Sequence, residues 1–211
     1  KSGVQYVKIS GSNDGTSRYN RFVPCFCEGT PILTNAGWKS VELLQPEDSI
    51  WTRDDDDALV RWVGRARTDG MGPMAPIRIE AGVLGEHGDL WVSPQHRILV
   101  EDFRLDLLTG HTAALVPAKH LVGIDGIRED PRARVTYVHF MMDNHAVVNA
   151  NGLLAESFYP GDVAVSGLNT AARQELFALF PELRHGVDAF GKMAAPCLGA
   201  TEASAFRSVF H

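Results

Sequence analysis

The chain has 211 residues, enough for one sizeable domain with appendages, and its 45% hydrophobic and 22% charged residues are typical of a folded globular protein. The net charge of −6 argues against a nucleic-acid-binding surface as the main function. No segment reaches the roughly 18 consecutive apolar residues of a membrane span, and three cysteines are too few for a disulfide framework.

Residues 1–24 and residues 25–160 differ in composition and in sequence pattern. Residues 1 to about 22 are rich in Gly, Ser, Asn and Asp, so we expect 1–24 to be an upstream linker arm. From Cys25 to about residue 160, short β-type segments alternate with turn signals. We predict a mainly β domain without βαβ units, with strands near 31–34, 38–44, 49–52, 58–63, 77–80, 90–93, 97–100, 114–117, 135–142 and 146–149.

After Pro160 the pattern changes to helix. Asn169 is a good N-cap, and apolar residues at helical spacing follow it as far as Pro181. A further short helix is expected over 201–210. Residues 161–211 are therefore predicted to form a C-terminal helical extension.

Cys25 is the first candidate for chemistry. A thiol attacks an amide only when neighbouring groups supply thiolate character or accept its proton. Cys25 and Cys27 are equally consistent with two small core residues on one face of a strand. No second Cys/His pair with zinc-site spacing accompanies them, so we expect neither a metal nor another cofactor.

Ser93 and His96 are the second candidates, in a polar turn between two apolar segments. A hydroxyl there can donate to a scissile carbonyl, and an imidazole can protonate the leaving nitrogen. A turn stabilised by the serine, with a surface histidine, explains the same residues without chemistry.

The third segment contains Asp143 and His145, followed by the hairpin-turn signal Asn151-Gly152. Aspartate and histidine at such a place can be ordinary turn residues. Chemistry becomes the better interpretation only because three such segments occur in one chain.

Together these segments resemble the Hint family of inteins, hedgehog autoprocessing domains and bacterial intein-like domains. The resemblance runs from Cys25 to about Tyr159. The segment Cys25-Phe26-x-x-Gly29-Thr30-x-Ile32 is similar to the family's first block, and Pro46-Glu47-Asp48 is similar to a loop that usually reads Pro-Gly-Asp. Ser93-Pro94-Gln95-His96 is similar to the Thr-x-x-His block, and residues 143–152 are similar to the penultimate strand pair. It implies a compact, horseshoe-like β fold for 25–160.

The resemblance also implies a reaction on the chain's own upstream polypeptide. Cys25 attacks the carbonyl of Pro24, so that the junction Pro24-Cys25 becomes a thioester in a single turnover. His96 protonates the departing nitrogen, and Ser93 acts on the oxyanion side. Water, a small thiol or an amine then opens the thioester.

Two departures from the family pattern modify this expectation. Inteins end with a His-Asn pair, and Glu156 and Ser157 stand at the corresponding positions, so we expect N-terminal cleavage without splicing. Asp143 and His145 would then shape the site or activate the opening nucleophile. The ring of Pro24 restricts the approach of the thiol, which would slow the reaction.

Other interpretations of the same residues stay open. An inactive Hint-type domain would serve as a structural or interaction module of a larger secreted protein, and a Cys25–His96 dyad would suit a hydrolase acting on other proteins. Cys27 either packs in the core or pairs with Cys25 as a disulfide. The style of the chain resembles bacterial Hint domains at the ends of secreted or cell-surface proteins.

Overall fold

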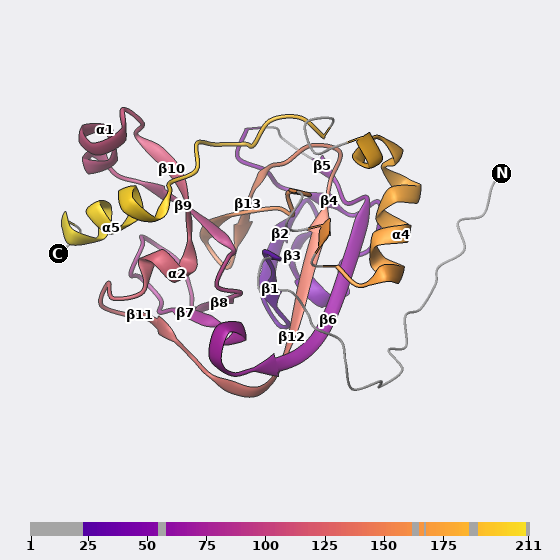
Figure 1. Cartoon of the computed structure of the whole chain (residues 1–211), viewed down its shortest axis with the longest axis horizontal. Helices are drawn as coiled ribbons and strands as arrows, with labels where there is room; N and C mark the ends of the chain where they lie inside the picture. The colour runs from indigo at the N-terminus through magenta and orange to yellow at the C-terminus, as the bar shows by residue number, and fades with distance from the viewer. Residues whose placement is uncertain (1–22, 55–57, 162–164, 167, 186–189, 210–211) are drawn as a thin grey trace.

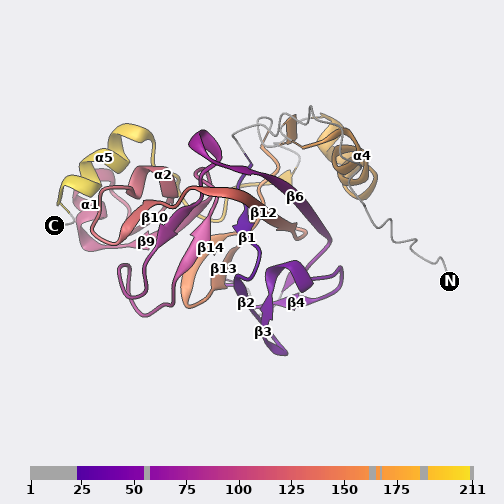
Figure 2. The same ribbon diagram turned by 90° about the horizontal axis from the view of Figure 1, so that it is seen from below.

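The computed structural model describes residues 23–54, 58–161, 165–166, 168–185 and 190–209. Most of the predicted linker arm, residues 1–22, lies outside the described residues. The described part is a mainly β fold of two curled antiparallel sheets with a few short helices at its ends (Figures 1 and 2). The predicted β class without βαβ units is therefore confirmed.

The first sheet places the earliest strand of the domain in its interior. Its members pair antiparallel throughout. In spatial order they are β11 (Ile127–Glu129), β7 (Ile77–Ile79), β8 (Leu90–Val92), β1 (Phe26–Cys27), β12 (Arg132–Met141) and β6 (Trp62–Gly70). The short strand β1 thus pairs with two strands that follow it far along the chain, Phe26 with Val92 on one side and with Val138 on the other.

The second sheet contains the hairpin predicted at Asn151-Gly152, which joins β13 to β14. Asn151 has a positive φ of 52°, as a tight hairpin turn requires. In spatial order the strands are β10 (Ala113–Pro117), β9 (Arg97–Glu101), β14 (Leu153–Glu156), β13 (Val147–Ala150), β2 (Pro31–Thr34), β4 (Ser49–Ile50) and β5 (Ala58–Leu59), with β3 (Gly37–Ser40) paired to β2.

Helices lie at two opposite ends of the molecule. One end carries α4 (Thr170–Leu179) beside β6, and the other carries α1 and α5 (Figures 1 and 2). The Asn169 side chain accepts a hydrogen bond from the Ala172 N–H, which confirms the predicted cap of α4. The remaining helices are η1 (Val41–Leu43), η2 (Gly72–Met74), α1 (Phe103–Thr109), α2 (Ala118–Leu121), η3 (Pro181–His185) and α5 (Ala200–Val209).

Two apolar clusters lie on opposite faces of the first sheet. The main core contains Phe26 and Val138, whereas the smaller cluster under α4 contains Cys25, Cys27 and Leu176. This division follows from the alternation of side chains along a strand, which sends Phe26 to one face and both cysteines to the other. Cys25 is therefore buried, but in the smaller of the two clusters.

Most predicted strands are present, and the exceptions have physical causes. Residues 38–44 begin as strand β3 and then turn into η1. The segment Phe103–Thr109 was given no element, yet Asp102 caps it as helix α1. No element is predicted over Ile127–Glu129, yet this segment forms β11, which pairs with β7. The last helix, predicted over 201–210, is confirmed as α5, and its Phe206 is buried in the main core.

Candidate active site

The register of β1 brings two distant segments to Cys25. Phe26 pairs with Val92 of β8 and with Val138 of β12, both antiparallel. Extending each register by one residue places Cys25 opposite Ser93 and opposite His139. Sheet pairing therefore brings the Ser93 segment, which was chosen from the sequence, and strand β12 to the cysteine.

Ser93 holds the backbone on both sides of Pro24. The Cys25 N–H donates to Ser93 Oγ at 2.9 Å, and the Ser93 hydroxyl donates to the Val23 carbonyl oxygen at 3.0 Å. The Ser93 N–H also donates to the Cys25 carbonyl at 2.8 Å. These bonds fix the nitrogen of the candidate scissile peptide in a buried position.

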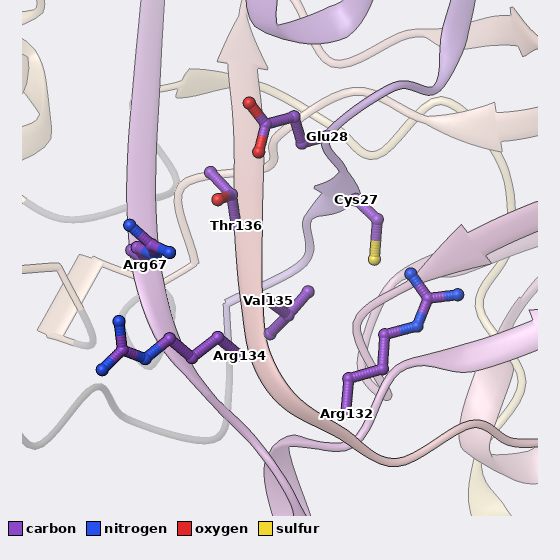
Figure 3. Close-up of a pocket in the computed structure, with 7 residues that line it drawn as sticks. All are labelled: Cys27, Glu28, Arg67, Arg132, Arg134, Val135 and Thr136. Carbon is purple, nitrogen blue, oxygen red and sulfur yellow. The ribbon is translucent and has the colours of Figure 1, made fainter.

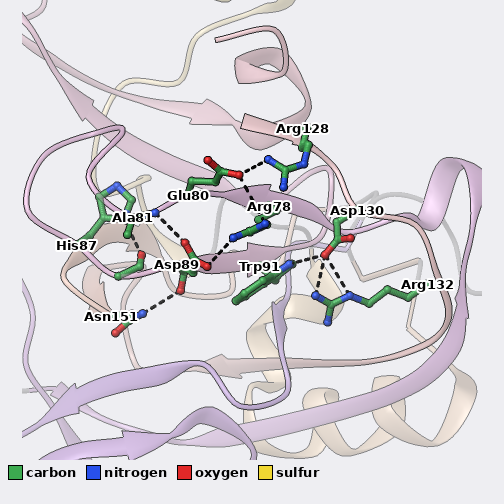
Figure 4. A network of polar contacts seen from close by, with 11 residues as sticks. Arg78, Glu80, Ala81, His87, Asp89, Trp91, Arg128, Asp130, Arg132 and Asn151 are labelled. Atoms are coloured by element: carbon green, nitrogen blue, oxygen red, sulfur yellow. Dashed lines mark hydrogen bonds and ion pairs between the residues drawn. The ribbon is translucent and has the colours of Figure 1, made fainter. Parts of the chain in front are cut away.

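The strand that carries Ser93 is itself anchored by a polar network (Figure 4). Trp91 of β8 donates from Nε1 to Asp130 Oδ2 at 2.6 Å, and Arg132 donates to the same oxygen at 2.7 Å. The guanidinium of Arg132 lies 5.0 Å from the centroid of the Trp91 ring. Asp89, which directly precedes β8, accepts from Arg78 at 2.8 Å. The position of Ser93 is thus fixed through β8.

His139 is the side chain that contacts the thiol. Its Nδ1 lies 3.3 Å from Cys25 Sγ, and Sγ also lies 3.5 Å from the Val23 carbonyl oxygen. The imidazole packs between Trp62 and Phe158, with ring centroids 5.1 Å and 5.3 Å away. Gly64 makes room for it, because a Cβ there would overlap His139 Nε2. The ring orientation is therefore set by packing.

Burial keeps the thiol and this imidazole uncharged. Desolvation raises the pKa of Cys25 well above its ordinary value, nearby Cys27 raises it further, and the hydrogen bond with Ser93 opposes both. Desolvation lowers the pKa of His139 to about 3. At neutral pH the resting pair is a thiol beside a neutral imidazole, so no thiolate is formed in advance.

His96 approaches β1 from the other face of the sheet. Its ring packs against Phe26, with centroids 4.1 Å apart, and it is 2% exposed. Neither ring nitrogen has a hydrogen-bond partner among the described residues. Desolvation lowers its pKa to about 4, with Glu156 acting in the opposite direction. His96 and His139 therefore flank the strand of the nucleophile from opposite sides.

Asp143 and His145 lie elsewhere. Asp143 is exposed and pairs with Arg61 at 3.2 Å. His145 is buried, accepts the Ala194 N–H at Nδ1 at 3.0 Å, and places Nε2 3.3 Å from Glu156 Oε2. No hydrogen bond joins either residue to Cys25 in the described part of the chain. Their proposed roles stay predictions.

Glu156 is the centre of this second cluster. It is fully buried and accepts the Arg97 backbone N–H at 2.9 Å and the Arg97 guanidinium at 2.8 Å. Burial raises the pKa of this carboxyl, but His145 and the charge of Arg97 outweigh burial and hold the pKa below its usual value. The neighbouring Ser157 hydroxyl accepts the Ala146 N–H at 3.0 Å.

Sequence reasoning missed His139 as a site residue. In the sequence it is one position of the predicted strand 135–142, although a histidine inside an otherwise apolar run is a usable signal. Only the pairing of β12 with β1 places it beside Cys25. No group of three or more metal-ligating side chains occurs among the described residues, and none of their helices is long and apolar enough to cross a membrane.

Known proteins provide a separate line of evidence. Residues 24–162 match the family model described as Hint domain. Among solved structures, a bacterial intein-like domain from Clostridium thermocellum is 14% identical, with a TM-score of 0.45 over 63% of this chain and 97% of its own. A splicing-inactive AceL NrdHF class 3 split intein is 16% identical, with a TM-score of 0.43 over 64% and 97% of the two chains. A DnaB intein from Synechocystis sp. PCC 6803 is 15% identical, with a TM-score of 0.40 over 64% and 98%. Among curated proteins, none matches this chain.

Proposed function

Because the chain belongs to the Hint domain family, we propose that Cys25 converts the Pro24–Cys25 peptide bond into a thioester and so releases the upstream polypeptide. The observation that carries the proposal is the buried contact of Cys25 Sγ with His139 Nδ1, made while Ser93 holds the Cys25 amide. A nucleophile, a proton acceptor and a fixed leaving nitrogen are the parts that an N-to-S acyl shift needs.

The proton transfers of this step balance within the site. His139 Nδ1 takes the thiol proton as Sγ attacks the Pro24 carbonyl carbon and a C–S bond forms. The C–N bond to Cys25 then breaks, and its nitrogen gains a proton. In this proposal His96 supplies that proton and regains one as His139 gives up the proton taken from the thiol, and Ser93, which already contacts the nitrogen, orients it. Over the whole step the thiol loses one proton and the nitrogen gains one, so neutral reactants give neutral products, which suits a buried site.

Cleavage at one junction only is part of the proposal. Glu156 and Ser157 occupy the positions where the family resemblance places a His-Asn pair, and both are buried and hydrogen-bonded. Neither can cyclise as an asparagine does. Residues downstream of Ser157 therefore stay attached, and water, a thiol or an amine opens the thioester.

The test is an intact-mass time course of the full chain with hydroxylamine or dithiothreitol. We expect release of residues 1–24 with first-order kinetics independent of protein concentration, because the reaction is intramolecular. Cys25→Ala removes the nucleophile and abolishes release. Cys197→Ala is the matched control, since that thiol is exposed and distant from β1 in sequence and sheet order. A rate proportional to protein concentration would instead indicate a hydrolase acting in trans.

The burial of the site favours one second candidate, an inactive structural module. Cys25 is 4% exposed and its pKa is raised, so the resting thiol is a weak nucleophile. An unchanged mass under both nucleophiles, with the fold intact by circular dichroism, would overturn the proposal and support this candidate.

A further inference from the structure

Helix α4 lies beyond the segment that matches the family model, yet it packs on the sheet that carries the nucleophile. The match ends at residue 162, and α4 begins at Thr170. Leu176 of this helix is fully buried in the same apolar cluster as Cys25. Figure 1 shows α4 alongside β6. Part of the cover over the candidate site therefore comes from the C-terminal extension.

The residue before Leu176 makes a polar contact with this sheet. Glu175 Oε2 accepts a hydrogen bond from Trp62 Nε1 at 3.1 Å. Trp62 is the first residue of β6 and is 2% exposed, and its indole nitrogen can only donate. A buried indole N–H usually finds a hydrogen-bond partner, because leaving it unpaired is costly. Here the acceptor for this N–H comes from α4.

Trp62 is also one of the two aromatic rings that hold His139. The ring centroids of Trp62 and His139 are 5.1 Å apart, with an interplanar angle of 35°, and Phe158 packs at 5.3 Å. His139 Nε2 has no hydrogen-bond partner in the part of the chain that the structure describes, and Nδ1 contacts Cys25 Sγ. The orientation of the imidazole therefore depends on its aromatic neighbours. A shift of the indole ring moves Nδ1 relative to the sulfur.

The two rings are packed closely against the backbone of β6. A Cβ at Gly64 would overlap both His139 Nε2 and the Trp62 ring. The pocket near the end of β1, drawn in Figure 3, is lined from β1, β12 and β6, and neither Cys25 nor His139 lines it. The position of His139 beside the thiol is thus set by packed groups and not by an open cavity.

We propose that Glu175 is a positioning residue for the thioester-forming step, acting through Trp62 on His139. The inference rests on the proposed function, because it concerns the imidazole that takes the thiol proton. Proton transfer needs donor and acceptor at hydrogen-bond distance, and a displacement of about 1 Å can cost about 10²-fold in rate. Release of the upstream polypeptide thus depends on a residue outside the matched segment 24–162.

The experiment measures cleavage of the full chain by intact mass, at a hydroxylamine concentration that saturates the rate, so that the acyl shift limits it. Glu175→Leu removes the acceptor, and we expect the rate to fall about two- to tenfold, the range of one hydrogen bond. Glu175→Gln keeps an oxygen that can accept from the indole and should restore most of the rate. Gln174→Leu, at an exposed position of the same helix, is the matched control and should leave the rate unchanged.

A second pair of variants separates positioning from a purely structural role. Trp62→Phe keeps an aromatic ring beside His139 but has no indole N–H. In this background Glu175→Leu should cause no further fall in rate, because the hydrogen bond that it removes is already absent. Circular dichroism checks that each variant is folded. An equal fall in both backgrounds would show that Glu175 does not act through the indole, and the proposal would be wrong.

The unsubstituted chain separates the two possible failures. If hydroxylamine cleaves it, but Glu175→Leu reacts as fast as Gln174→Leu or Glu175→Gln as slowly as Glu175→Leu, the positioning role is wrong and the proposed function stands. If hydroxylamine leaves the mass of the unsubstituted chain unchanged, the proposed function is wrong, and the positioning role fails with it.

Discussion

The molecule contains two buried polar clusters that differ in charge. Around Cys25, burial keeps the thiol and the imidazole of His139 neutral, and His139 Nε2 has no hydrogen-bond partner among the described residues. Around Glu156, a buried carboxylate is paired with the guanidinium of Arg97, although Arg97 Nε and His145 Nε2 also have no hydrogen-bond partner in the described part of the chain. The first cluster is therefore suited to proton transfer between neutral groups, whereas the second is organised around an ion pair.

The two clusters are also covered in different ways. Trp62, which packs on His139, donates to Glu175 of α4 at 3.1 Å, so a helix covers the first. The chain around Pro196 covers the second: Leu115 of β10 donates to the Pro196 carbonyl at 2.7 Å, and Ala194 donates to His145. The site where the family would carry out C-terminal chemistry is thereby closed with backbone hydrogen bonds.

The largest expected effect is on the first cluster. His139→Phe keeps the ring packing against Trp62 and Phe158 but removes the proton acceptor from the thiol. We expect the rate of hydroxylamine-induced cleavage to fall about 10²- to 10⁴-fold, the usual contribution of a general base. His111→Phe, at an exposed position, is the control. A fall of less than about threefold would remove His139 from the mechanism, since a general base contributes far more than that.

In the second cluster the main expected effect is on stability. Glu156→Gln leaves the partly buried guanidinium of Arg97 without a counter-charge, and breaking a fully buried pair in this way costs about 3–5 kcal/mol, which is the upper bound here. The free energy of unfolding from a denaturant titration measures this loss. Glu101→Gln, which breaks the exposed pair with Arg53, should cost less than about 1 kcal/mol. Equal losses for the two variants would contradict the structural role of Glu156.

The pH dependence of stability distinguishes buried imidazoles from paired ones. His96 and His139 have pKa values of about 4 and about 3 when folded, below the ordinary 6.5. The unfolded chain therefore takes up protons below pH 6.5 that the folded chain does not. The free energy of unfolding should fall by about 1.4 kcal/mol per pH unit for each imidazole between pH 6 and pH 5.

This slope can be assigned by substitution. In denaturant titrations at pH 6 and pH 5, His96→Phe should reduce the change in the free energy of unfolding by about 1.4 kcal/mol per pH unit, the contribution of one imidazole. A slope that is the same in both proteins would show that His96 is not held neutral by burial.

The smallest effect is expected at the rim of the second cluster. Asp143→Asn breaks the exposed pair with Arg61 and should change the free energy of unfolding by less than about 1 kcal/mol. The same titration measures it. A larger loss would mean that Asp143 is coupled to the buried His145–Glu156 pair rather than separate from it.

The sequence predicted much of this architecture because its signals are local. The turn at Asn151-Gly152, the cap at Asn169 and the alternation of short apolar segments depend on neighbouring residues. Helix α1 and strand β11 were missed for the complementary reason. The first depends on the Asp102 cap in a segment without a strong helical pattern, and the second on pairing with a strand 50 positions earlier in the chain, as Ile127 pairs with Ile79 and Glu129 with Ile77.

The candidate site shows the same division. Residue type and order along the chain identified Cys25, Ser93 and His96 as candidates, because the reactivity of a thiol, a hydroxyl or an imidazole is a property of the residue type itself. Only the tertiary structure selected His139 as the partner of the thiol and separated Asp143 and His145 from it. Contacts between β1, β8 and β12 depend on strand register across more than 100 residues of chain, as Phe26 pairs with Val138, and no local pattern encodes that register.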